Sequence, residues 1–414
     1  MSLMTMKTHS NRIRLSAFVF LLAVQAPFIG SAFAAEKQSL RAEVGAPLQE
    51  AQKALQAKDY KGALAKINAA EAVGKLTSYE SYIINSLKAS AALGGGDYKT
   101  ALTAFEQVLE SPELPPAEKL QKYDAYVKIA YASKDYNKTA EAIEKYKAAG
   151  GSNAETLGLY VQSLYLAGKY KEAGVELASQ IKSLEAAGKR PTDTQLQLLA
   201  SCALKQNDMV AYTAALEKIV TYTPKPDYWL DLTLRTSNKP GFSPNLTLDV
   251  YRLRKRTETL QKTGDYMEAA QLALQAGFPG EAQAFVDEGY AKKLLGEGAD
   301  ASRHQRLKDL VAKKLADDKA TLAEGEKAAA AQATGDALVA TGFNLVAYGD
   351  FDKGIALMEQ GIAKGGLKSA DQAKLHLGYA QLLAGKKTEA KKTLAEVKAT
   401  DGSADMARLY TLAG

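Results

Sequence analysis

The pattern of apolar and polar residues is organised around a recurrent turn, in which Gly or Lys precedes Asp and an aromatic residue follows. Gly or Lys ends one helix, Asp caps the next, and the aromatic residue begins it. The aromatic residues of the first four turns are 38, 38 and 34 residues apart (60 to 98, 98 to 136, 136 to 170), a period typical of stacked helical hairpins. The turns are Lys58-Asp59-Tyr60, Gly96-Asp97-Tyr98, Lys134-Asp135-Tyr136 and Gly168-Lys169-Tyr170, with looser copies at Gly264-Asp265-Tyr266, Gly349-Asp350-Phe351 and Gly385-Lys386-Lys387.

Small residues recur in register with this turn. Two antiparallel helices approach closely only where both carry small side chains, so the register predicts an all-α fold built from helix hairpins. Three residues after the aromatic position come Ala63, Ala101, Thr139, Ala173, Gly354 and Ala390. Nine residues before it come Ala51, Ala89, Gly342 and Gly378, whereas Val127 and Val161 depart from the rule.

These features resemble the tetratricopeptide repeat family, in particular its exported bacterial members. The Leu377-Gly378 pair, the closing Pro224 and the opening Trp229 match parts of the family pattern, although no single repeat carries all of it. The resemblance runs from about Ala46 to the end of the chain. It implies a right-handed solenoid of antiparallel helix hairpins with a concave inner face lined by the first helix of each hairpin.

Departures from the repeat divide the chain. Residues 35–225 are predicted to form an N-terminal array, and 226–300 irregular hairpins that include a basic helix from Leu246 to Gln261. Within that second region Tyr266 is expected in a first helix, and Phe278-Pro279 is expected to open the second. Residues 301–334 are predicted to form a long charged spacer helix, and 335–414 a C-terminal hairpin pair followed by a helix that caps the stack.

The first 34 residues have the pattern of a cleavable secretory signal peptide. A positive stretch precedes an interrupted apolar run from Leu15 to Ile29, and Ala32-Phe33-Ala34 provides small residues for cleavage. The pattern therefore predicts a mature chain that begins near Ala35 in the periplasm, without a lipid anchor or a further membrane span. A membrane anchor at the same place is the alternative. Removing the signal lowers the net charge from +6 to +3, which does not predict nucleic-acid binding.

The sequence offers no catalytic constellation, so no enzyme activity, cofactor or metal is predicted. Cys202 lies in an apolar run and is expected to be a small buried residue. His304 is expected to be a solvated helix residue and His376 a partly buried packing residue. The single glycine-rich segment, Gly94-Gly95-Gly96, is interpreted as a connector between helices.

Tyrosine is the one enrichment, with 21 residues. Several are expected on the inner face, where a rigid ring with a polar tip suits recognition. Packing between neighbouring repeats remains the alternative for each of them. The resemblance, with the register, predicts a protein-binding face made of Lys128, Tyr131, Gln162, Tyr165, Gln197 and Ser201, together with Phe343 and Tyr379 in the C-terminal pair.

The expected function is therefore a periplasmic scaffold that holds a protein or peptide of the cell envelope in its groove. The resemblance also implies an accessory role in an envelope machine such as a TonB-type system. The alternative is a module that binds glycan or a small ligand beside cell-wall enzymes. A deep pocket of tyrosines and carboxylates would favour the alternative, and an open strip of side chains would favour the scaffold.

Overall fold

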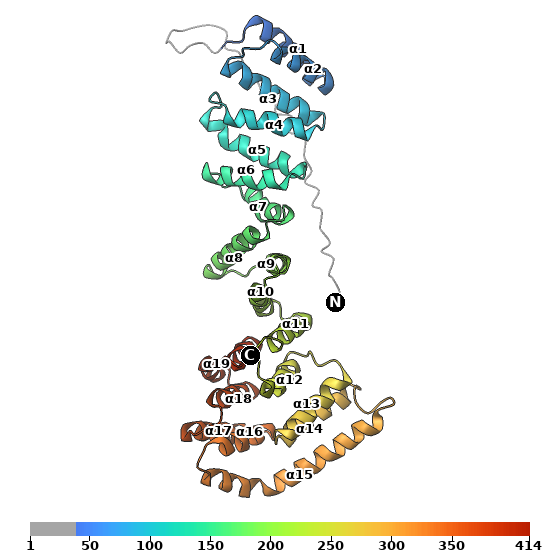
Figure 1. Ribbon diagram of the computed structural model, residues 1–414, viewed down its shortest axis with the longest axis vertical. Coiled ribbons are helices and arrows are strands. Elements are labelled where there is room, and N and C mark those ends of the chain that lie inside the picture. The colour runs from blue at the N-terminus through green and yellow to red at the C-terminus, as the bar shows by residue number, and fades with distance from the viewer. Residues whose placement is uncertain (1–38) are drawn as a thin grey trace. The chain divides into compact units, whose positions relative to one another are not determined.

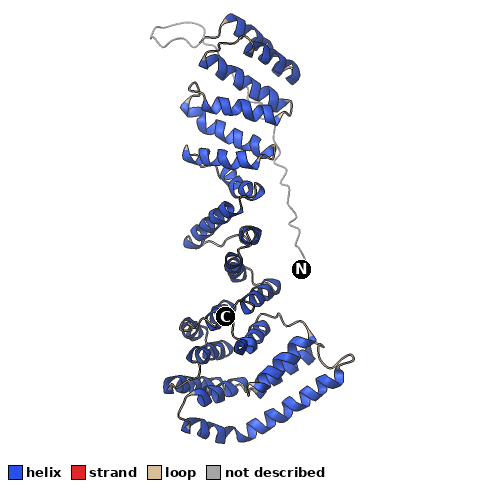
Figure 2. Cartoon of the chain, viewed as in Figure 1, coloured by secondary structure: helices blue, strands red, loops and turns tan. Residues whose placement is uncertain are grey.

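The computed structural model describes residues 39–414, and every regular element in that range is a helix (Figure 2). The predicted signal peptide and the expected start near Ala35 lie outside the described residues. The chain divides into two compact units, one ending at Lys169 and the other beginning at Tyr170. This division falls inside the predicted N-terminal array, and the predicted divisions at 225, 300 and 334 stay predictions.

The N-terminal unit consists of successive antiparallel hairpins, whose helices α1 to α6 follow one another in Figure 1. Each helix packs against the next one in the sequence, which is the arrangement expected of tetratricopeptide-like repeats. The helices are α1 (Ala42–Gln56), α2 (Tyr60–Glu71), α3 (Ser78–Gly94), α4 (Tyr98–Glu110), α5 (Lys119–Ala132), α6 (Tyr136–Ala148) and α7 (Ala154–Leu166), with a 3-10 turn at Pro116–Glu118 before α5.

The recurrent turn has the predicted geometry. Lys58, Gly96 and Lys134 adopt positive φ angles of 59°, 79° and 63°, which reverse the chain after the first helix. The Asp that follows each of them caps the second helix; the Asp135 carboxylate, for example, accepts a hydrogen bond from the Lys138 backbone N–H at 3.1 Å. The capping carboxylate satisfies one of the backbone donors that the first turn of a helix leaves free.

The predicted close crossings are also confirmed. Ala51 and Ala63 are fully buried where α1 meets α2. The closest crossing joins α16 (Asp336–Ala347) and α17 (Phe351–Lys364), where a β-carbon added at Gly342 would lie 2.6 Å from the carbonyl oxygen of Gly354. Only glycine at both positions allows these two backbones to come so close.

The C-terminal unit contains one large hydrophobic core. The long charged helix α15 begins at Ala301 as predicted, ends at Ala331, and packs against α13, α14 and α16. Tyr266 lies in α13 and Phe278-Pro279 opens α14, as predicted. The remaining helices are α8 (Tyr170–Ala186), α9 (Asp193–Lys205), α10 (Met209–Tyr222), α11 (Pro226–Ser237), α12 (Thr247–Arg256), α13 (Thr263–Gln275), α14 (Pro279–Ala291), α15 (Ala301–Ala331), α18 (Ala370–Leu383), α19 (Lys387–Ala395) and α20 (Ser403–Ala413), with a 3-10 turn at Pro244–Leu246.

Helix α20 differs from the expected cap, because it packs back on helices far earlier in the chain. It contacts α10, α11 and α12 as well as α18 and α19. Arg408 pairs with Glu217 of α10 at 2.9 Å, and the backbone N–H of Ser243 donates to the carbonyl of Asp401 at 2.7 Å. Met406 and Tyr410 are fully buried. The C-terminal unit is therefore closed by long-range contacts, unlike a simple stack.

Two further expectations concern single residues. His304 was expected in solvent, but it is buried, and its Nδ1 accepts a hydrogen bond from the Gly296 backbone N–H at 3.1 Å. It closes the loop that precedes α15, a contact that the surrounding charged residues conceal in the sequence. Cys202 is fully buried as expected, and burial raises the pKa of its thiol to about 11. A thiol with so high a pKa is inert at neutral pH.

Candidate protein-binding surface

The predicted binding residues of the N-terminal unit lie on α5 and α7, which pack side by side. Lys128 forms an ion pair with Asp124 one turn earlier on α5, at 2.9 Å, and approaches Glu155 of α7 at 4.0 Å. Asp124 in turn accepts a hydrogen bond from the hydroxyl of Thr156. The Lys128 side chain is 35% exposed, so its ammonium group is held in place but remains accessible to solvent.

Tyr131 lies one turn beyond Lys128 and is half-buried. Its ring packs edge-on against Tyr136 with centroids 5.8 Å apart, and its hydroxyl interacts with Gln162 of α7. Burial raises the pKa of Tyr131, the nearby Tyr136 raises it further, and the Gln162 contact opposes that rise. The hydroxyl therefore stays protonated at neutral pH. Tyr165 follows Gln162 by three residues on the same helix and is partly exposed.

We define the α5–α7 surface as Lys128, Tyr131, Gln162 and Tyr165. Of these residues, Tyr131 and Gln162 touch each other across two hairpins, and Lys128 reaches α7 through Glu155. Sequence reasoning missed Asp124 and Glu155, which orient Lys128. The spacing of Asp124 and Lys128, four residues apart on one helix, is the signal that could have revealed the first of them.

Gln197 and Ser201 belong to the C-terminal unit and lie on α9. The Gln197 side-chain amide donates to the hydroxyl of Tyr228 on α11 at 2.9 Å, and Gln197 is itself exposed. Ser201 is partly exposed. Both residues therefore reach the surface of their unit, and their predicted role in binding stays a prediction.

Phe343 and Tyr379 do not line an open face. Their exposed fractions are 2% and 4%, and their rings stack on each other with centroids 6.3 Å apart. Neighbouring side chains cover both rings. Arg252 of α12 lies over each of them, Phe278 at the start of α14 packs on Phe343, and Tyr410 of α20 packs on Tyr379. We therefore correct the expectation for these two residues: their rings belong to the core of the C-terminal unit.

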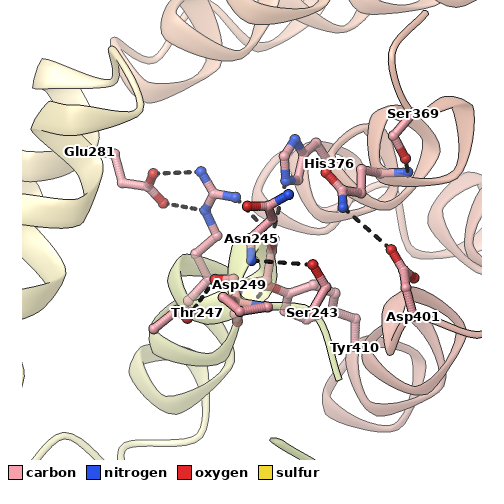
Figure 3. A network of polar contacts seen from close by, with 12 residues as sticks. Ser243, Asn245, Thr247, Asp249, Glu281, Ser369, His376, Asp401 and Tyr410 are labelled. Carbon is pink, nitrogen blue, oxygen red and sulfur yellow. Dashed lines mark hydrogen bonds and ion pairs between the residues drawn. The ribbon is translucent and has the colours of Figure 1, made fainter. Parts of the chain in front are cut away.

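The rings surround a buried charge network, shown in Figure 3. Arg252 is 1% exposed and donates two parallel hydrogen bonds to Glu281, both at 2.7 Å, and a third to Asp249 at 2.9 Å. Asp249 also faces the Nε2 of His376 at 3.3 Å and accepts, through its backbone carbonyl, a hydrogen bond from the Tyr410 hydroxyl at 2.9 Å. These bonds join α12, α14, α18 and α20.

Aromatic rings and charge compensation make this buried network tolerable. The Arg252 guanidinium lies over the rings of Phe343, Phe278 and Tyr379, at 4.6, 5.4 and 5.8 Å from their centroids. Burial alone would raise the pKa of Asp249, but His376 and Arg252 lower it to about 2. The carboxylate is thus charged at neutral pH, and the network orders four helices.

The predicted basic helix is consequently not a basic surface. Arg252 is buried, and Arg254 forms a two-pronged contact with Asp265, at 3.0 and 2.7 Å. Alternating Asp and Arg at a spacing of three residues, as in Asp249 and Arg252, was the available sequence signal for internal pairing. His376 is partly buried and packs on the ring of Phe343 as expected, and it also takes part in the polar network.

Within residues 39–414 no group of three or more histidine, cysteine or acidic side chains is arranged to hold a metal ion. In the same range no helix combines the length and apolar character required to cross a bilayer.

Comparison with known proteins places few constraints on the chain. No protein-family profile matches it, and no curated protein sequence does. Among solved structures, yeast Tom70 is similar at 12% identity and a TM-score of 0.25, over 89% of this chain and 94% of that one. Naa15/Naa10 bound to HypK-THB is similar at 13% identity and a TM-score of 0.23, over 88% and 70%. At these scores the function must be argued from the chain itself.

Proposed function

We propose that the chain is an exported scaffold that binds an extended protein segment along the α5–α7 surface. We further propose that it acts in the periplasm as an accessory part of an envelope machine, with TonB-type systems as the expected class. One observation carries the binding proposal: residues that precede two successive turns touch across two hairpins, as Tyr131 of α5 does with Gln162 of α7. A recognition surface that continues from repeat to repeat is the feature that helical repeats provide to extended partners.

The chemistry of this surface suits a polypeptide. A half-buried tyrosine contributes a large contact area at a small entropic cost, and an exposed glutamine amide can pair with a peptide backbone. Lys128, held by Asp124 and Glu155, adds a charge with a fixed position. Because these side chains are already ordered by their own contacts, a partner would lose little free energy in fixing them.

Site-specific photocrosslinking tests this proposal. A photoreactive benzoylphenylalanine at Gln162 should crosslink a discrete partner in intact cells, since that side chain is exposed on the α5–α7 surface. The matched control replaces Glu144, which is exposed on α6, and should give no such product. Equal products from both positions would refute the surface assignment.

Once a partner is known, the double substitution Tyr131→Ala with Tyr165→Ala should weaken its binding by tenfold or more, because central aromatic anchors often contribute about 2 kcal/mol each. Tyr160→Ala is the control on the same helix, where the Tyr160 hydroxyl bonds Glu144 instead. A double variant that loses helicity would show that the rings serve the core.

Export has its own test. N-terminal sequencing of the protein recovered from the periplasmic fraction should begin within about two residues of Ala35, given the small residues before it. A protein that retains the apolar run from Leu15 to Ile29 would refute the cleavable signal and favour the membrane anchor.

The alternative, glycan binding, is favoured by a cavity of about 220 Å³ elsewhere in the N-terminal unit. Tyrosine rings beside carboxylates are suited to stacking on sugar rings and to bonding their hydroxyls. Calorimetric titration with soluble N-acetylglucosamine oligomers should then show saturable binding that Tyr123→Ala abolishes. A titration that releases or absorbs no heat would exclude glycan binding in this cavity. The cavity is lined by, among others, Tyr123, Tyr126, Glu106, Glu110 and Glu141.

A further inference from the structure

The C-terminal unit contains a wide cleft of about 550 Å³ that the predicted function does not use. That volume lies within the range typical of small-ligand sites. The end of α12, the end of α14 and the last turn of α18 form its walls. Its lining residues are Lys255, Arg256, Glu258, Glu288, Lys292, Tyr379 and Leu383.

Most charges in the cleft are already paired. Glu288 binds both lysines, Lys292 at 2.8 Å and Lys255 at 3.4 Å. Arg256 is different: its Nε donates to the carbonyl oxygen of Ala413 at 2.9 Å, and no residue within 39–414 accepts from its two terminal nitrogens. With three cations and two carboxylates, the lining carries one net positive charge, which matches a singly charged anion better than a dianion.

Tyr379 supplies the second, independent observation. The residue is 96% buried, since its exposed fraction is 4%, and its ring is fixed between Phe343 and Tyr410. The hydroxyl nevertheless has no hydrogen-bond partner among the described residues, and the side chain forms part of the cleft lining. The ring is buried but the hydroxyl is open to the cleft, so a ligand there could accept its hydrogen bond.

Apolar surface lies next to these donors. Leu383 follows Tyr379 by one helical turn on α18 and is 42% exposed, which is unusual for a leucine beside a well-packed core. A ligand that satisfied Arg256 and Tyr379 with one group would therefore meet an apolar contact within a few ångströms.

We propose that this cleft binds an acidic peptide segment, with an aspartate or glutamate carboxylate accepting from Arg256 and Tyr379 and an apolar neighbour packing on Leu383. A planar carboxylate matches the paired terminal nitrogens of a guanidinium. The cleft lies wholly within the C-terminal unit, so this proposal does not depend on whether the α5–α7 surface binds a partner.

A matched pair of peptides tests the proposal on the full chain. The probes are acetyl-Leu-Asp-Leu-amide and its uncharged counterpart acetyl-Leu-Asn-Leu-amide, observed through ring-carbon NMR signals of labelled tyrosine. The Tyr379 signal is identified as the one missing in Tyr379→Phe. It should shift in a saturable manner with the aspartate peptide, and tenfold less affinity is expected for the asparagine peptide because a charged acceptor bonds more strongly.

Variants decide whether Arg256 carries the site. Arg256→Gln should weaken binding of the aspartate peptide tenfold or more, whereas Arg306→Gln, an exposed cation on α15, should leave it unchanged. Arg256→Lys keeps the charge and should retain part of the affinity if the glutamine variant proves unstable. Equal shifts with both peptides, no saturation, or binding that survives Arg256→Gln would each overturn the proposal. An equal response to acetate alone would overturn its peptide component.

Discussion

Replacing Arg252 with methionine is expected to destabilise the C-terminal unit by about 3–4 kcal/mol at neutral pH. Methionine reproduces the arginine side chain only as far as Nε, so the substitution removes the charge and also leaves a void where the rest of the buried guanidinium lay. It leaves Glu281 without the guanidinium that donates two hydrogen bonds to it, and it removes the guanidinium that donates one to Asp249.

The magnitude follows from the chemistry of a carboxylate. A buried, unpaired glutamate can always escape by taking up a proton, and from an ordinary pKa near 4.3 this costs about 4 kcal/mol at pH 7. That figure is the upper limit of the destabilisation that unpaired Glu281 can cause in the Arg252→Met variant. It agrees with the roughly 3–5 kcal/mol that breaking a buried ion pair costs. The cost should therefore fall by about 1.4 kcal/mol for each unit that the pH is lowered toward 5.

Trp229 provides a selective assay. It is the only tryptophan of the chain and is 3% exposed in the C-terminal unit, so its fluorescence during urea unfolding reports on that unit. Adding Glu281→Gln to the Arg252→Met variant should recover most of the loss, since no unpaired glutamate remains. Arg306→Met, at an exposed position of the same unit, should change stability by less than about 0.5 kcal/mol. A loss below about 1 kcal/mol, or one independent of pH, would refute the reasoning.

Three further predictions concern acid stability, the recurrent turn and the closest crossing. Because the pKa of Asp249 falls to about 2 on folding, its carboxylate should stabilise the fold fully above pH 4, and this stabilisation should be lost as the pH drops from about 4 to 2. Asp249→Asn should therefore remove that part of the acid unfolding transition followed by Trp229 fluorescence. Lys134→Gly should stabilise the N-terminal unit by up to about 1 kcal/mol in thermal unfolding followed by circular dichroism, since φ is 63° there; a lower melting temperature would contradict this. Gly342→Ala should cost about 1–3 kcal/mol through overpacking, while Gly325→Ala, with nothing within 4 Å, should be neutral or stabilising; equal effects would show that the α16–α17 crossing is misplaced.

The hairpins could be predicted because their determinants are local. A residue with positive φ, a capping Asp and an aromatic residue act within three positions, so the turn at Lys134 and Asp135 is legible without knowledge of the rest of the chain. The small residues that let helices cross are also tied to the turn at a fixed distance. For that reason Ala51, Ala63 and the Gly342–Gly354 pair lie where the register places them.

The closure of the C-terminal unit was not predictable in this way. The contact between Tyr410 and Asp249 joins residues 161 positions apart, and no local pattern encodes which helix covers which. Phe343 and Tyr379 illustrate the consequence: the register does not reveal that Arg252, Phe278 and Tyr410, from distant parts of the chain, cover their rings. Arg252 shows the same limit for charges, because the spacing of Asp249 and Arg252 indicates an ion pair but not whether the rest of the chain buries it.

The two proposed binding sites are built in different ways. In the N-terminal unit each helix packs on its neighbours in sequence. Lys128 and Gln162 therefore stay accessible, and contacts within α5 and with the adjacent hairpin order them. In the C-terminal unit the buried network holds α12, α14 and α18 together, and these are the helices whose ends form the cleft beside Arg256 and Tyr379. The destabilisation expected for Arg252→Met should consequently loosen the cleft while leaving the α5–α7 surface intact. Peptide binding in the cleft and partner binding on α5–α7 should then respond independently to that one substitution, which separates the two proposals in a single variant.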